Sequence, residues 1–181
     1  METIGFLELS SIAKGIEAAD AMLKSAEVSM ITAKASCPGK YHVLITGDVA
    51  AVKSSIEAGE TIAEGFVIES TVIPRVHPQV IRAISAEDIP EQANAVGIVE
   101  FMSVTSSIMC ADAAVKAADV KLIDVRLGSG IGGKSFVILT GEVSAVKTSV
   151  ESGAKAGSRH GFLLNKVTIP NPHRDIFESL C

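Results

Sequence analysis

Cys37 is the residue of this sequence with the clearest potential for chemistry. It lies in the string Ala-Lys-Ala-Ser-Cys-Pro-Gly-Lys, between two strand-like runs. Pro38 and Gly39 predict a tight turn, which places the thiol at the tip of a hairpin. A thiolate binds transition metals, but Cys37 has neither a CxxC partner nor a nearby histidine. On the residues alone, a partly exposed thiol and a metal ligand both remain open.

The other candidate ligands are isolated in the sequence. The three cysteines are odd in number and far apart, which argues against a disulfide framework and favours a reducing compartment. Cys110 lies in a predicted helix, where we expect a small packing residue. Cys181 is the last residue and is expected to be frayed. His77 and His173 follow matching Ile-Pro strings, which favours surface or interface groups.

The string Gly-Ser-Gly-Ile-Gly-Gly-Lys at 128–134 resembles a phosphate-binding loop in composition. Such a loop follows a strand, ends in Gly-Lys-Ser/Thr and leads into a helix. The string runs on into Ser135 and comes close to that ending, but a strand-like run follows it. It therefore predicts a flexible, glycine-rich hairpin turn.

The composition predicts a folded protein with a core of small aliphatic side chains. The chain has 181 residues, of which 48% are hydrophobic, 20% charged and 4% aromatic, and it has no Trp. The formal charge of −5 and the absence of a run of Lys and Arg argue against a nucleic-acid partner. The apolar runs are too short to span a bilayer, and we expect neither a membrane partner nor a signal peptide.

The chain is an internal duplication. Residues 5–31 repeat at an offset of 92, residues 39–59 at an offset of 94, and residues 65–77 at an offset of 96, with 28 of 61 compared positions identical. The polar segment 85–95 predicts a linker. We therefore expect one domain at 1–88 and a second at 94–181.

Each copy predicts the order β-α-β-β-α-β, an α+β fold of the ferredoxin-like kind, followed by a short helix. Ser10 or Ser11 is the expected cap of the first helix, and Asp48 caps a second helix that Gly59 ends. The strands expected in the first copy are 3–9, 28–35, 41–47 and 66–73. The expected apolar positions are Ile12, Ile16, Ala19 and Leu23 in the first helix, Val104, Ile108, Ala111 and Val115 in its second copy, and Val49, Val52 and Ile56 facing inward in the second helix.

Several strings together resemble bacterial microcompartment shell proteins. They are "AADAMLKSAEV", "GKYHVLITGDVAAVKSSIEAG" and "VIPRVHPQVI", with their partners in the second copy. The tandem arrangement and the Cys-Pro-Gly turn are similar to the trimeric, tandem-domain iron–sulfur shell proteins of the propanediol-utilisation type. The resemblance covers nearly the whole chain and implies a variant of the fold described above.

The resemblance implies a trimer whose hairpin turns surround a central pore. Three Cys37 thiolates around a three-fold axis would hold one [4Fe-4S] cluster per trimer, which aerobic preparations can lack. The turn residues implied around the pore and cluster are Ser36, Pro38, Gly39, Lys40, Ser129, Gly130, Ile131 and Gly132.

The resemblance also implies which side chains lie at the edge of the tile. Lys24 and Lys116 occupy equivalent positions, and Arg75 matches an edge arginine of the family. The second copy has Asn171 in place of Arg75, so the edges are expected to differ.

Taken together, these features favour a non-enzymatic shell protein in a cytoplasmic microcompartment. Its expected partners are further copies of itself, other shell proteins and encapsulated redox enzymes, and its cluster would transfer electrons or be delivered across the shell. Two alternatives stay open: a metabolite-conducting pore tile without a cluster, and a small-molecule-binding regulator.

Overall fold

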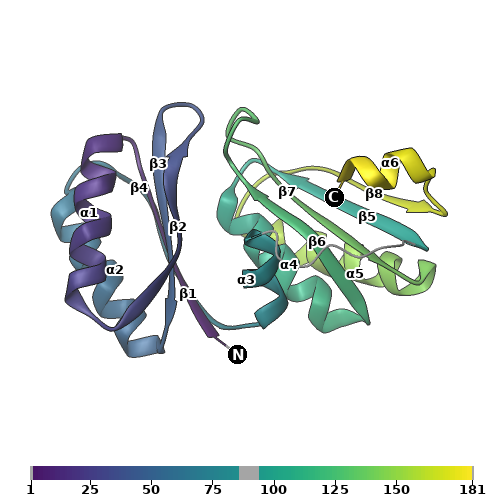
Figure 1. Cartoon of the computed structure of the whole chain (residues 1–181), viewed down its shortest axis with the longest axis horizontal. Coiled ribbons are helices and arrows are strands. Elements are labelled where there is room, and N and C mark those ends of the chain that lie inside the picture. Colours follow the sequence, from purple (N-terminus) through teal and green to yellow (C-terminus); the bar gives the residue numbers. More distant parts are fainter. Residues whose placement is uncertain (1, 86–93, 181) are drawn as a thin grey trace. The chain divides into compact units, whose positions relative to one another are not determined.

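The computed structural model describes residues 2–85 and 94–180, which divide into two compact units. The first unit spans Met1–Val76 and the second His77–Cys181. Each contains one four-stranded antiparallel sheet with two helices on one face (Figure 1). The domain limits 1–88 and 94–181 remain a prediction, and most of the predicted linker lies outside the described residues.

The first unit has the predicted order β-α-β-β-α-β. Its sheet has the strand order β2-β3-β1-β4, so β1 and β3 are central and β2 is an edge strand. The core lies between the sheet and the two helices and is built mainly from Leu, Val, Ile and Ala. The elements are β1 Glu2–Leu9, α1 Ile12–Ser25, β2 Val28–Ser36, β3 Lys40–Gly47, α2 Val49–Ala63 and β4 Val67–Val76.

Helix α1 begins as predicted but buries a different face. The Ser11 hydroxyl accepts a hydrogen bond from the Lys14 amide at 3.3 Å and caps the helix. The predicted apolar positions Ile12, Ile16 and Leu23 are exposed, so that part of the prediction is wrong. The fourth predicted position, Ala19, is buried as expected. Small side chains let the helix approach the sheet closely and form most of the buried face: Gly15, Ala18, Ala19 and Met22.

Helix α2 continues one turn past Gly59, so the predicted helix end is wrong. Gly59 is buried in the helix interface, where an added Cβ would lie 2.7 Å from Cγ of Met22. This glycine therefore serves close helix packing rather than termination. Asp48 is the N-cap residue, but its side chain makes no capping hydrogen bond. Of the predicted inward positions, Val52 and Ile56 are buried, whereas Val49 is exposed.

The second unit repeats this fold, with the strand order β6-β7-β5-β8. Here three of the four predicted apolar positions of α4 are buried, Val104, Ile108 and Ala111, and the fourth, Val115, is half-buried. Helix α6 covers the sheet face opposite α4 and α5 (Figure 1), where Phe177 packs against a small apolar cluster. The elements are α3 Pro78–Ile84, β5 Ala95–Phe101, α4 Val104–Ala117, β6 Val120–Leu127, β7 Ser135–Gly141, α5 Val143–Gly157, β8 Leu163–Pro170 and α6 Arg174–Leu180.

Candidate functional site

The hairpin of β2 and β3 presents Cys37 as predicted. The two strands pair as far as Ser36 with Lys40, which leaves a three-residue turn between them. The thiol-bearing residue is half-buried, and Pro38 and Gly39 are exposed. Gly39 has φ 73°, a left-handed conformation that other residues adopt only with strain. The turn geometry therefore requires the glycine and holds the cysteine at the hairpin tip.

An ion pair at the base of this turn was not predicted from the sequence. The Lys40 ammonium pairs with the Glu8 carboxylate at 2.9 Å, which ties the turn to the central strand β1. The equivalent pair in the second unit is Lys134 with Glu100, at 3.0 Å. The glutamate and the lysine of this pair occur at equivalent positions in both copies. That repetition is the sequence signal that could have identified the pair. The Ser36 hydroxyl is buried and has no hydrogen-bond partner among the described residues.

The turn of β6 and β7 is longer and carries no thiol. It is closed by the Gly128 amide, which donates to the Lys134 carbonyl at 3.0 Å. Ser129 occupies the position equivalent to Cys37, and its hydroxyl donates to the Leu127 carbonyl at 3.5 Å. All four of its glycines have positive φ: Gly128, Gly130, Gly132 and Gly133. The turn is the predicted glycine-rich hairpin and leads into a strand.

Cys110 is packed in the interior, as predicted. Its side chain is fully buried, and burial raises the pKa of its thiol to about 12. It lies against Gly153, where an added Cβ would be 2.7 Å from its Sγ. Cys181 lies outside the described residues. Within residues 2–85 and 94–180, no group of three or more His, Cys, Asp or Glu side chains could hold a metal ion.

His42 is a buried titratable group near the hairpin that the sequence did not indicate. It pairs with Lys34 across β2 and β3 and with Glu8 across β1 and β3. Neither ring nitrogen finds a hydrogen-bond partner in the described part of the chain. Burial, and secondarily the charge of Lys34, lowers its pKa to about 4. The histidine is therefore neutral at physiological pH.

The predicted edge residues lie on the helices and at the ends of the last strands. Lys24 pairs with Asp20, and Lys116 with Asp112, each at 2.5 Å along its own helix. Lys24 is strongly exposed, with 73% of its side chain accessible. Arg75 and Asn171 occupy equivalent positions, with positive φ of 57° and 47°. This shared bend turns the chain from the last strand toward the short helix in both copies, although the side chains differ.

Comparison with known proteins agrees with this duplicated fold. The BMC domain matches twice, at residues 3–76 and 95–172. The chain is 42% identical over 179 residues to the bacterial microcompartment shell protein PduT of Citrobacter freundii, covering 99% of this chain and 97% of that protein. The shell protein PduA of the same organism is 40% identical over 86 residues, which are 47% of this chain and 89% of PduA. The crystal structure of a microcompartment protein from Desulfitobacterium hafniense DCB has a TM-score of 0.95 and 52% identity, with coverage of 98% of this chain and 99% of that one.

Two complete copies of one shell domain define a tandem-domain structural protein. The chain belongs to the BMC domain family and is a bacterial microcompartment shell protein rather than an enzyme. The expected fold and family are thereby confirmed. Of the helices in the described ranges, none is long and apolar enough to cross a membrane.

Proposed function

We propose that three copies of this chain form a pseudo-hexagonal shell tile whose central pore holds one [4Fe-4S] cluster through Cys37 of each copy. The duplication supports the trimer, because three two-domain chains supply six equivalent domains. PduA, 89% of which matches about half of this chain, is consistent with one repeat being the elementary unit.

The half-exposed Cys37 at the tip of a hairpin is the observation that carries the cluster proposal. Within the described residues, a single chain offers no group of three or more His, Cys, Asp or Glu side chains that could hold a metal ion, and the proposed three-fold symmetry would supply the other two thiolates. Three thiolates leave one iron of a [4Fe-4S] cluster for a non-cysteine ligand. Cys110 is excluded as a ligand because it is buried and its pKa is raised to about 12.

The remaining turn residues would surround the cluster without ligating it. Ser36, Pro38 and Gly39 flank the thiol, and the Lys40 ammonium is held at the base of the turn by Glu8. The second hairpin adds mostly small residues to the rim: Ser129, Gly130, Ile131 and Gly132. When bound, the cluster supplies one-electron redox chemistry. It would pass electrons across the shell to encapsulated redox enzymes, or be delivered to them.

Anaerobic reconstitution tests this site. The wild-type protein should take up iron and sulfide equivalent to about one cluster per trimer. Cys37→Ser should lose the cluster and remain trimeric by light scattering, while Cys110→Ser and Cys181→Ser should keep it. A colourless wild-type trimer would instead favour a metabolite-conducting tile. A stable monomer or dimer would favour a small-molecule-binding regulator.

Contacts between tiles form the second part of the proposal. Lys24, Lys116 and Arg75 would lie at the edge of the tile and contact neighbouring tiles of this or other shell proteins. The exposure of Lys24 supports this assignment, because its pair with Asp20 is solvated and contributes little to the fold.

A further inference from the structure

Four polar side chains share one face of the first sheet at the base of the turn between β2 and β3. Ser36 pairs with Lys40 across β2 and β3, and His42 pairs with Glu8 across β1 and β3. Residues that pair directly, and residues two apart on one strand, lie on the same face of a sheet. Tyr41, which lies between Lys40 and His42, packs against the helix core on the other face. We call the four polar residues the turn-base cluster.

Only part of the turn-base cluster finds partners within the chain. The Lys40 ammonium and the Glu8 carboxylate are paired at 2.9 Å. The Ser36 hydroxyl and both ring nitrogens of His42 have no hydrogen-bond partner among the described residues, although the two residues are only 7% and 0% exposed. A buried polar group without a partner costs about 1–3 kcal/mol. These atoms therefore indicate a hydrogen-bond partner that is not part of the described chain, such as a bound water or a ligand.

The second unit shows that the fold requires neither of these groups. The positions equivalent to Ser36 and His42 are Gly128 and Phe136, while the ion pair is retained as Lys134 with Glu100. The buried, unpartnered groups therefore occur in the repeat that carries the cysteine at its hairpin tip, and the equivalent positions of the other repeat have no polar side chain.

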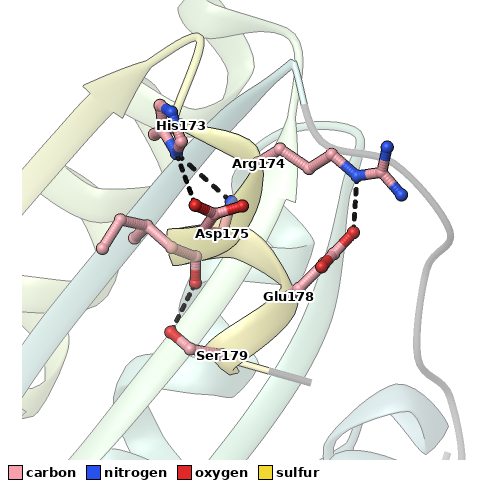
Figure 2. Close-up of polar contacts among 6 residues, drawn as sticks. His173, Arg174, Asp175, Glu178 and Ser179 are labelled. Carbon is pink, nitrogen blue, oxygen red and sulfur yellow. Dashed lines mark hydrogen bonds and ion pairs between the residues drawn. The ribbon is translucent and has the colours of Figure 1, made fainter.

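The corresponding face of the second sheet is apolar where α6 covers it. Phe177 and Leu180 of this helix pack there with Phe136. The polar side chains of α6 pair along the helix itself (Figure 2): His173 with Asp175 at 3.7 Å, and Arg174 with Glu178 at 2.5 Å. The polar lining thus distinguishes the hairpin of the first unit from that of the second.

We propose that the Ser36 hydroxyl, oriented by His42, donates a hydrogen bond to a sulfur of the proposed cluster and thereby raises its reduction potential. The inference rests on the proposed function and assigns a tuning residue to that site. Ser36 directly precedes the ligand Cys37, and its buried hydroxyl has no acceptor among the described residues. A donor to a cluster sulfur stabilises the reduced state more than the oxidised state, because the reduced cluster carries one more negative charge.

His42 is the positioning residue in this arrangement. Ser36 and His42 are diagonal neighbours on the paired strands, a separation that one bound water can bridge. A neutral imidazole has one N–H donor. When this donor supplies the serine oxygen, directly or through the water, the hydroxyl proton is left for the sulfur. The same arrangement gives partners to buried atoms that the chain leaves unpaired.

Redox titration of the reconstituted trimer tests the hydrogen bond. Ser36→Ala should keep its iron and sulfide. At a fixed solution potential its ratio of reduced to oxidised cluster should fall about tenfold, equivalent to about 59 mV for a one-electron couple. Ser36→Thr retains a hydroxyl and should keep the wild-type ratio. Ser129→Ala is the matched control, because the Ser129 hydroxyl donates to the Leu127 carbonyl, and it should also leave the ratio unchanged.

The outcomes separate this inference from the cluster proposal. Equal ratios in the wild type and Ser36→Ala, both with full iron content, overturn the hydrogen bond and leave the cluster in place. An equal fall in Ser36→Thr and Ser36→Ala assigns the effect to packing and also overturns it. A wild-type trimer that takes up no iron overturns the cluster and this inference together.

Electron–nuclear double resonance of the reduced cluster gives a second measurement. Comparison of protein in normal and deuterated water should reveal an exchangeable proton that is lost in Ser36→Ala and retained in Ser36→Thr. His42→Phe introduces the residue of the second unit and should weaken this coupling and lower the ratio of reduced to oxidised cluster. If Ser36→Ala fails to take up iron, His42→Phe decides the question, and an unchanged coupling and ratio in that variant overturn the inference.

Discussion

Tyr41 on β3 fills the space beside Gly15 on α1. A Cβ at Gly15 would lie 2.5 Å from both Cβ and Cδ1 of Tyr41, so a side chain here would require the helix and the strand to move apart. In the second unit the equivalent residues are Ser107 and Ser135, whose hydroxyls are hydrogen-bonded at 2.6 Å. At this contact between helix and hairpin, the first repeat therefore has a large aromatic side chain beside a glycine. The second repeat has two small hydroxyl side chains at the same positions.

Gly15→Ala should destabilise the protein by about 1–3 kcal/mol, because the added methyl group overpacks the contact with Tyr41. Urea unfolding measures the change, and Lys14→Ala on the same helix should stay within about 0.5 kcal/mol of the wild type. The double variant Gly15→Ser with Tyr41→Ser reproduces the residues of the second unit. Its loss of unfolding free energy should be smaller than the sum of the losses in the two single variants. Additive single effects would show that the two positions are not coupled.

The duplication made most of the fold predictable from the sequence. Because each pattern occurs in both copies, the same strands and helices could be predicted twice. The Cys-Pro-Gly turn could be predicted from its own residues. The buried face of α1 was not predictable from periodicity, because Gly15 and Ala18 pack close to the sheet while larger apolar residues face outward. Gly59 was wrongly taken as a helix end because its role depends on Met22, which is distant in sequence.

The candidate site was only partly predictable for a similar reason. The position of Cys37 follows from local turn chemistry, whereas the pair of Lys40 with Glu8 depends on strand register. The burial of His42 was hidden because a histidine in a strand is more often accessible than enclosed. Repeat comparison offers the missing signal there, since the second copy has Phe136 at the equivalent position.

His42 should make the stability of the protein depend on pH. Its pKa is lowered from 6.5 to about 4 by burial, so the unfolded chain binds a proton more readily between these values. The stabilising contribution is fully present above pH 6.5 and is lost as the pH falls toward 4. The shift corresponds to at most about 3 kcal/mol, measurable by urea unfolding across this range.

His42→Phe should remove this pH dependence. It introduces the residue found in the second unit and eliminates two buried ring nitrogens that lack partners among the described residues. The variant should be more stable than the wild type by about 1–3 kcal/mol at pH 5. His173→Phe is a suitable control because that histidine is exposed. An unchanged pH profile in His42→Phe would show that another group is responsible.

The two described cysteines should differ strongly in reactivity. With a pKa of about 12, Cys110 has roughly one thiolate in ten thousand at pH 8, and its side chain is buried. In a Cys181→Ser background, a thiol reagent should therefore label one cysteine rapidly in the cluster-free native protein and two after denaturation. Adding Cys37→Ser should abolish the rapid phase. Rapid labelling that persists in this variant would mean that Cys110 is accessible in the native protein.

Removing Lys24 and Lys116 should weaken the contacts between neighbouring tiles and leave the fold and the trimer unchanged. Lys24 and Lys116 pair with aspartates on their own helices, and such pairs contribute only a few tenths of a kcal/mol, so Lys24→Ala with Lys116→Ala should remain folded and trimeric. Electron microscopy should show fewer or smaller two-dimensional sheets, because contacts between tiles lose their charges. Lys53→Ala with Lys147→Ala is a matched control, since it removes two exposed lysines at equivalent positions of α2 and α5. Equal loss of sheets in both variants would indicate a general charge effect, and loss of the trimer would place the edge lysines within the tile.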